Sequence, residues 1–265
     1  MSKTIENLEK AIYNQHEHPT KLKTAYDYLN RLYFAINDTC NKSVELLVGD
    51  AVYLVGNSMI INLMLTKIVT QALMPKKYGG FRGDSKVFIL DAGNCTDVYQ
   101  FVDFMKQYGL DIKKSLSKIM ISRVFTVYQL THFLKYELLK IIHKNRTDVV
   151  MIPDLLAMFT KEPDINHREI EFLLRDIRGL LKEVSSKHKV LLITSISLTH
   201  NKLSPKVIVL RNKLLGMFNK CIKVDMNKTN DKFKVLIQEK HDVDYITIKK
   251  YLYISSQDIL TVTSR

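Results

Sequence analysis

The sequence predicts an α/β protein in which helices cover both faces of a mostly parallel sheet, with an antiparallel C-terminal edge and an N-terminal helical segment. From residue 51 to about residue 194, short β-rich runs alternate with longer stretches of helical spacing. This alternation is typical of βαβ units and a mostly parallel sheet. The last third instead carries three β-rich runs, at 221–226, 233–238 and 245–254, with a polar turn at 227–231. We expect these runs to be antiparallel strands at one edge of the sheet.

Five β-rich runs are expected to form the central strands. They cover residues 51–55, 86–90, 118–122, 148–152 and 189–194. Apolar residues at helical spacing follow the first four runs, over residues 60–74, 98–105, 127–141 and 170–184. The fifth run is the most apolar. Near-continuous apolar runs of this length suit strands buried between two layers of helices.

Residues 1–40 are predicted to form a helical segment, and residues 41–265 the core domain. Apolar residues recur at helical spacing in two pieces, from Ile5 to Ile12 and from Leu22 to Ile36, with Pro19 between them. A proline inside a helical pattern ends or kinks the helix. We therefore expect a helical hairpin before the core.

The composition describes a folded chain that is expected to be soluble and intracellular. With 265 residues, 46% of them hydrophobic, the chain can bury a full core. No apolar run reaches the roughly 20 residues that a membrane helix needs, and the first ten residues are charged rather than a secretory signal. Cys40, Cys95 and Cys221 lie far apart, which disfavours a disulfide framework and a zinc site.

Basic residues outnumber acidic residues in the chain, and part of it has no acidic residue at all. The formal net charge is +13, and residues 185–224 contain no Asp or Glu but eight Lys or Arg. Such a surplus attracts polyanions, so nucleic acid or an acidic partner is expected. The alternative is a solvated basic face without a partner.

The first expected strand leads into its helix through a turn that reads GNSMIINL, residues 56–63. An α/β ATPase carries GxxxxGK[ST] here, because the glycines make room for phosphate, the Lys meets the phosphates and the Ser or Thr binds Mg²⁺. Only the first glycine is present, and no GK[ST] occurs anywhere in the chain. The degenerate remnant of a phosphate loop consists of Gly56, Asn57, Ser58 and Asn62.

Several further segments resemble the RecA/RadA recombinase superfamily. Residues 71–91 are similar to the family's "LP…GG…G" loop and the strand after it, and YGLD at 108–111 and RVF at 123–125 resemble two later family stretches. VVMIPD at 149–154 looks like the Walker B strand, residues 189–195 like the sensor strand, and residues 221–240 like the late β-hairpin. The resemblance spans about residues 44–240 and rests on the order and spacing of several motifs.

The resemblance implies that five roles in ATP binding and hydrolysis are vacant. The replacements are Asn62 for the P-loop Lys, Leu63 for the hydroxyl residue, Gly93 for the catalytic Glu, Pro153 for the Walker B Asp and Ile196 for the sensor Gln. Asp154 could be a Walker B Asp shifted by one residue, but the alternation along a strand would turn it to the opposite face. Since phosphoryl transfer depends on such positioned charges, we expect no catalytic residue, no cofactor and no metal.

In this family, a loop after the Walker B strand and a loop after the sensor strand hold single-stranded DNA. The matching stretches are residues 160–168 and 198–213, and the second lies inside the acid-free basic run. The predicted DNA contacts are Lys161, Arg168, Lys202, Lys206, Arg211 and Lys213. Aromatic residues are scarce there, so binding is expected to be directed to the backbone and independent of base sequence.

Three functions remain open from the sequence. The first is a non-catalytic RecA/RadA-like paralogue that binds DNA, preferentially single-stranded, and assists an active recombinase or another repair protein. The second is a RecA-like interaction subunit without DNA binding, and the third is a divergent RadB-like ATPase. Because no Phe-x-x-Ala docking motif precedes residue 44, we expect a small oligomer or heterocomplex rather than long filaments. The resemblance places the protein with the nucleoid in a prokaryotic cytoplasm, or in a eukaryotic nucleus.

Overall fold

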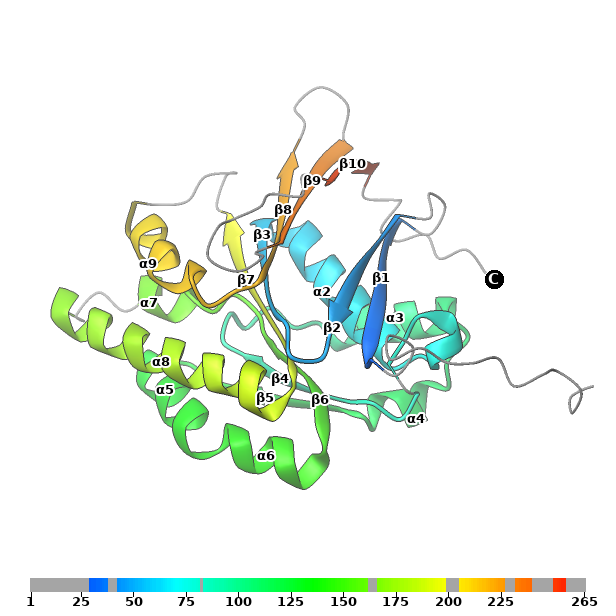
Figure 1. Ribbon diagram of the computed structural model, residues 1–265, viewed down its shortest axis with the longest axis horizontal. Helices are drawn as coiled ribbons and strands as arrows, with labels where there is room; N and C mark the ends of the chain where they lie inside the picture. The colour runs from blue at the N-terminus through cyan, green and yellow to red at the C-terminus, as the bar shows by residue number, and fades with distance from the viewer. Residues whose placement is uncertain are drawn as a thin grey trace, which may run out of the picture.

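The computed structural model describes residues 29–37, 42–81, 83–161, 166–198, 205–226, 232–239 and 250–255. In these residues a large sheet lies between two layers of helices (Figure 1). Helices α2 (Ser58–Ala72), α3 (Val98–Gln107) and the short α4 (Ile112–Leu116) cover one face. Helices α5 (Val127–Tyr136), α6 (Leu138–Asn145), α7 (Ala157–Lys161), α8 (His167–His188) and α9 (Pro205–Leu215) cover the other.

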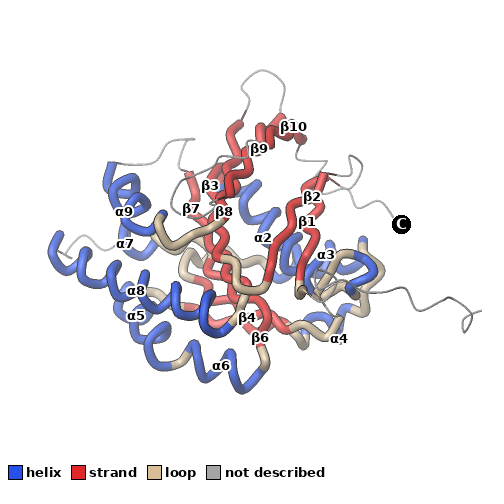
Figure 2. The backbone as a smooth tube through the Cα atoms, viewed as in Figure 1, coloured by secondary structure: helices blue, strands red, loops and turns tan. Residues whose placement is uncertain are grey.

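The sheet has eight described strands in the order β10-β9-β8-β3-β7-β6-β4-β5. The strands are β3 (Ala51–Asn57), β4 (Lys86–Asp91), β5 (Ile119–Arg123), β6 (Thr147–Ile152), β7 (Leu191–Leu198), β8 (Lys220–Met226), β9 (Lys232–Glu239) and β10 (Lys250–Ser255). All pairs from β8 to β5 are parallel, and β9 runs antiparallel to both β8 and β10 (Figure 2). The predicted fold class is confirmed: a mostly parallel α/β sheet with an antiparallel edge, consistent with a RecA-like fold.

The core is divided by the sheet, because successive side chains of a strand point to opposite faces. In β3, Val52 and Leu54 pack with α2 and α3, whereas Tyr53 and Val55 pack with the helices of the other face. All of these side chains are buried. The near-continuous apolar runs therefore mark strands covered on both sides, as the sequence predicts.

The N-terminal end of the described chain differs from the prediction. Helical spacing through Leu32 and Ile36 predicted a helix, but Arg31–Asn37 is strand β1, which pairs antiparallel with β2 (Lys42–Leu47). Leu32 and Phe34 are buried while Tyr33 between them is exposed, so the actual period is two. The two strands lie on either side of the expected boundary at residue 40, and both pack into the core. Residues 1–28, where the rest of the helical hairpin is expected, lie outside the described residues.

Two further expectations need correction. The run 221–226 was expected to be antiparallel, but β8 is parallel to β3 and only its pairing with β9 is antiparallel. The helical pattern at 127–141 is divided into α5 and α6 at Glu137, which has a non-ideal φ of −111°. Strand pairing and helix breaks of this kind depend on tertiary contacts that periodicity does not reveal.

Candidate functional site

Strand β3 continues directly into helix α2, so the turn has no loop that could wrap a phosphate. β3 ends at Asn57 and α2 begins at Ser58. Asn57 caps the helix, because its Oδ1 accepts a hydrogen bond of 3.0 Å from the amide of Met59. A phosphate loop instead needs several residues between strand and helix, whose amides surround the phosphates.

Gly56, the first glycine of the expected phosphate loop, lies inside β3 and beside β8. A Cβ on Gly56 would lie 2.5 Å from the carbonyl oxygen of Val224 and 2.9 Å from its Cβ. A glycine within a strand often marks such a close approach of backbone. The close approach of β3 and β8 therefore accounts for Gly56 without any phosphate.

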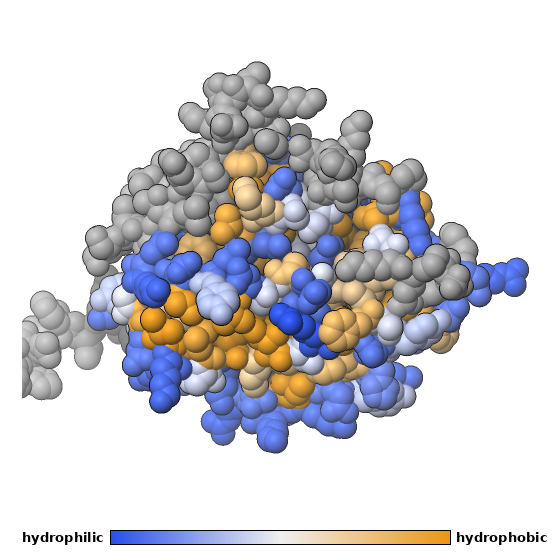
Figure 3. All heavy atoms as spheres, turned by 180° about the vertical axis from the view of Figure 1, so that it is seen from behind, coloured by the Kyte–Doolittle hydropathy of each residue, from blue (hydrophilic) through white to orange (hydrophobic). Residues whose placement is uncertain are grey.

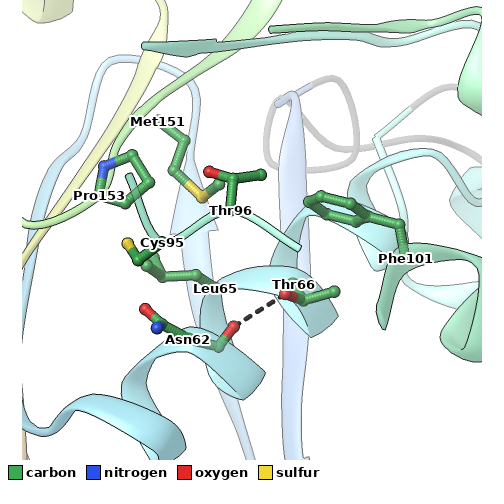
Figure 4. A pocket seen from close by; sticks show the side chains of 8 residues that line it. All are labelled: Asn62, Leu65, Thr66, Cys95, Thr96, Phe101, Met151 and Pro153. Atoms are coloured by element: carbon green, nitrogen blue, oxygen red, sulfur yellow. Dashed lines mark hydrogen bonds between the residues drawn. The ribbon is translucent and has the colours of Figure 1, made fainter. Parts of the chain in front are cut away.

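Figure 4 shows the small cavity where a nucleotide's phosphates would be expected, between α2 and the ends of β4 and β6. The cavity is lined by Asn62, Leu65, Thr66, Cys95, Thr96, Phe101, Met151 and Pro153. Its volume is about 10 Å³. This is room for about one water molecule, whereas small-molecule sites occupy several hundred Å³.

The structure brings together three of the positions that the resemblance assigned to ATP chemistry. Asn62 and Pro153 line the same cavity, and the amide of Gly93 donates a hydrogen bond of 3.1 Å to the carbonyl oxygen of Pro153. A Cβ on Gly93 would lie 2.7 Å from the Cβ of Asp154 and 3.0 Å from Sγ of Cys95. Without a rearrangement, no side chain fits there, and this includes a glutamate.

The other two assigned positions are buried in the layers of the core. Leu63 packs in the core on the face of the sheet that α2 and α3 cover, and it is 9% exposed. Ile196 of β7 packs on the opposite face of the sheet and is 3% exposed. Neither residue lines the cavity beside Asn62.

Asp91 holds the loop that closes this cavity, a role that the sequence did not indicate. Its carboxylate is fully buried at the end of β4 and accepts hydrogen bonds from the amides of Cys95 (3.0 Å) and Thr96 (3.1 Å). Nε of Arg123 lies 3.5 Å from the same carboxylate. The available signal was an acidic residue at the end of an apolar strand. Its role here is to bind protein amides.

Asp154 lies in the turn after β6 and is directed toward β7. Its backbone has a left-handed φ of 48°. Its amide donates to Oγ of Ser195 over 3.0 Å, and its Oδ1 accepts from the amide of Ser197 over 3.4 Å. Asp154 does not line the cavity with Asn62. A shifted Walker B role would need a carboxylate at that cavity.

The structure describes the side chains of four of the six predicted DNA contacts, which lie on helices α8 and α9. The stretch 198–213 was expected to be a loop, but helix α9 begins at Pro205. Arg168 and Lys206 are exposed in the first turns of α8 and α9. Lys202 lies outside the described residues, and the structure describes only the backbone of Lys161.

Arg211 and Lys213 are both partly buried. Nζ of Lys213 forms an ion pair with the carboxylate of Glu171 on α8. The positive charge of Arg211 acts on both Tyr53 and Cys221. Burial raises the pKa of the Cys221 thiol to about 11, and the positive charge of Arg211 opposes that rise. Burial likewise raises the pKa of Tyr53 far above its usual value.

Compared with models of protein families and with curated protein sequences, the chain gives no significant match. No helix in the described part of the chain is both long enough and apolar enough to cross a membrane. Among the described residues, no group of three His, Cys, Asp or Glu side chains is placed to hold a metal ion. The class of the protein therefore rests on its fold, and membership of the recombinase superfamily stays a prediction.

Proposed function

We propose that this protein is a non-catalytic RecA-like paralogue that binds nucleic acid without ATP and assists homologous recombination or repair. The observation that carries the proposal is the closed phosphate site: β3 enters α2 without a loop, and the cavity beside Asn62 measures about 10 Å³. A RecA-like protein without room for a nucleotide cannot hydrolyse ATP, but it keeps the outer surfaces that can bind other molecules. The net charge of +13 favours a polyanion as the ligand.

The test uses fluorescence anisotropy to measure how tightly the full chain binds a labelled single-stranded oligonucleotide at 50 and 200 mM salt. We expect affinity that falls steeply with salt and does not change with ATP and Mg²⁺, because phosphate contacts release counterions. A calorimetric titration with ATP and Mg²⁺ should give no heat of binding. Micromolar ATP affinity would support the ATPase alternative, and no oligonucleotide binding at 50 mM salt would exclude the proposed function.

A second function, a RecA-like interaction subunit without DNA binding, is favoured by the β5 edge of the sheet, which no described strand covers. Among the described strands none pairs with the outer side of β5. Ile121 in β5 and Phe125 just after it are 38% and 66% exposed. On the face opposite to Figure 1, hydrophobic side chains gather in one area (Figure 3). Exposed edges and apolar patches are common sites of protein association.

A co-purification with an active recombinase separates the two functions. For the interaction subunit, Ile121→Lys should abolish a complex that forms in the absence of DNA. For the DNA-binding paralogue, the same substitution should leave oligonucleotide affinity unchanged, since β5 carries no part of the proposed nucleic-acid contact.

A further inference from the structure

Helices α8 and α9 enclose a groove that is separate from the degenerate nucleotide site. Its volume is about 180 Å³, and its lining residues are Glu171, Leu174, Arg175, Arg178 and Lys213. Three of the five are cations, one is an acid and Leu174 is buried. A groove of this composition suits an anionic ligand better than an apolar one.

The charges of the groove are unevenly paired. Glu171 and Lys213 form an ion pair across the two helices, so their charges largely cancel. Arg175 and Arg178 are exposed and lie three residues apart on α8, which puts them on one side of the helix. Nη2 of Arg178 lies 3.5 Å from the place of a Cβ on Gly216, at the end of α9. Two guanidinium groups therefore give the groove its net positive charge, and guanidinium matches phosphate in geometry.

An aromatic side chain stands beside these arginines. Phe172 is 53% exposed, one turn before Arg175, and the guanidinium carbon of Arg175 lies 5.3 Å from its ring centroid. Exposed aromatic rings beside cations form the stacking platforms on which proteins bind unpaired bases. A free phosphate ion has no base that could stack on this ring.

The cations continue along α8 beyond the groove. Arg168 is exposed seven residues before Arg175, which is about 10.5 Å along a helix axis. A line of cations of this length follows a chain of phosphates better than a single anion. From α9 the groove is lined by Lys213, and the exposed Ile208 and Val209 of that helix are not among its lining residues.

The geometry points to the groove between α8 and α9 as a binding site for a single-stranded polynucleotide, with Arg175 and Arg178 on phosphates and Phe172 under a base. This inference rests on the proposed nucleic-acid binding and locates it. It transfers the main contact from the stretch 198–213 to the α8 side of this groove.

The test measures the affinity of the full chain for a fluorescein-labelled 20-nucleotide single strand over a range of salt concentrations. For Arg175→Ala/Arg178→Ala we expect the log–log salt slope to fall by about 1.4, because each lost phosphate contact removes about 0.7. Phe172→Ala should weaken binding by about tenfold with little change in slope. The matched control is Lys135→Ala/Lys144→Ala, which removes two exposed cations from α5 and α6 and should leave both quantities unchanged.

A substitution that should strengthen binding provides a second test. Glu171→Gln removes the acid that neutralises Lys213, so it should strengthen binding and raise the salt slope by about 0.7. Its control is Glu183→Gln, whose ion pair with Lys187 lies at the other end of α8. Circular dichroism and thermal unfolding establish that each variant is folded.

The outcomes separate this site from the proposed function. If the wild-type chain binds no oligonucleotide, the proposed function fails together with this inference. If the wild-type chain binds but Arg175→Ala/Arg178→Ala binds like the control, only this site is refuted. Inorganic phosphate at constant ionic strength should not displace the oligonucleotide, and displacement at low millimolar phosphate would make the groove a site for a free anion instead.

Discussion

Replacing Gly56 by Ala should destabilise the protein, although Ala normally fits a strand at least as well as Gly. The new Cβ would lie 2.5 Å from the carbonyl oxygen of Val224, roughly 0.9 Å short of an ordinary contact, and that oxygen belongs to paired backbone. Separating β3 from β8 in the centre of the sheet is overpacking, which costs about 1–3 kcal/mol. For a chain of this size, about 2 kcal/mol corresponds to a loss of roughly 4–8 °C in Tm.

The assay is thermal and urea unfolding of wild type and Gly56→Ala, with Gly179→Ala as control. Gly179 lies inside α8 with nothing within 4 Å of an added Cβ, so its replacement should stabilise the helix by about 0.5–1 kcal/mol. The two substitutions should therefore shift Tm in opposite directions. If Gly56→Ala unfolds within 1 °C of wild type, the close approach of β8 is not what requires this glycine.

Five other positions in the fold give four further predictions. Asn62→Lys/Leu63→Thr should not create ATP binding in calorimetry, because β3 still enters α2 without a phosphate loop. Asp91→Ala should lower the free energy of unfolding in urea by about 3 kcal/mol, since it removes a fully buried carboxylate and leaves the partly buried amides of Cys95 and Thr96 without their acceptor. Tyr53→Phe should be neutral or raise that free energy by up to about 1 kcal/mol, because among the described residues its buried hydroxyl has no hydrogen-bond partner. The Cys221 thiol should stay protonated at pH 9 and react slowly with iodoacetamide, because burial raises its pKa from 9.0 to about 11.

The raised pKa of Cys221 also fixes the sign of its effect on stability. The folded state holds the thiol proton more tightly than the unfolded state, so this contribution is complete below pH 9 and is lost as the pH rises toward 11. Alkylation is measured in a variant with Cys40→Ser and Cys95→Ser, so that Cys221 is the one thiol that can react. Rapid alkylation at pH 8 in the folded protein would contradict the raised pKa of this partly buried thiol.

The alternation of apolar runs was enough to place most elements of the core and their order. Runs such as 86–90 and 148–152 are strands within one residue of the prediction. This succeeds because period two and period 3.6 are local properties of the chain that burial on a sheet or a helix imposes. The absence of a GK[ST] triplet is local as well, and for that reason the sequence alone predicts a defective phosphate loop.

Tertiary structure decided which segments pair, how much room they leave and where long side chains point. Arg31–Asn37 is a strand only because β2 is available to pair with it, and Gly56 reflects the approach of β8, some 170 residues later in the chain. The sequence grouped Lys213 with Lys206 by proximity, yet the fold pairs Lys213 with Glu171 and places it beside Arg175 and Arg178. The physical reason is that pairing, cavity volume and charge neutralisation arise between residues distant in sequence, and periodicity carries information only about neighbours along the chain.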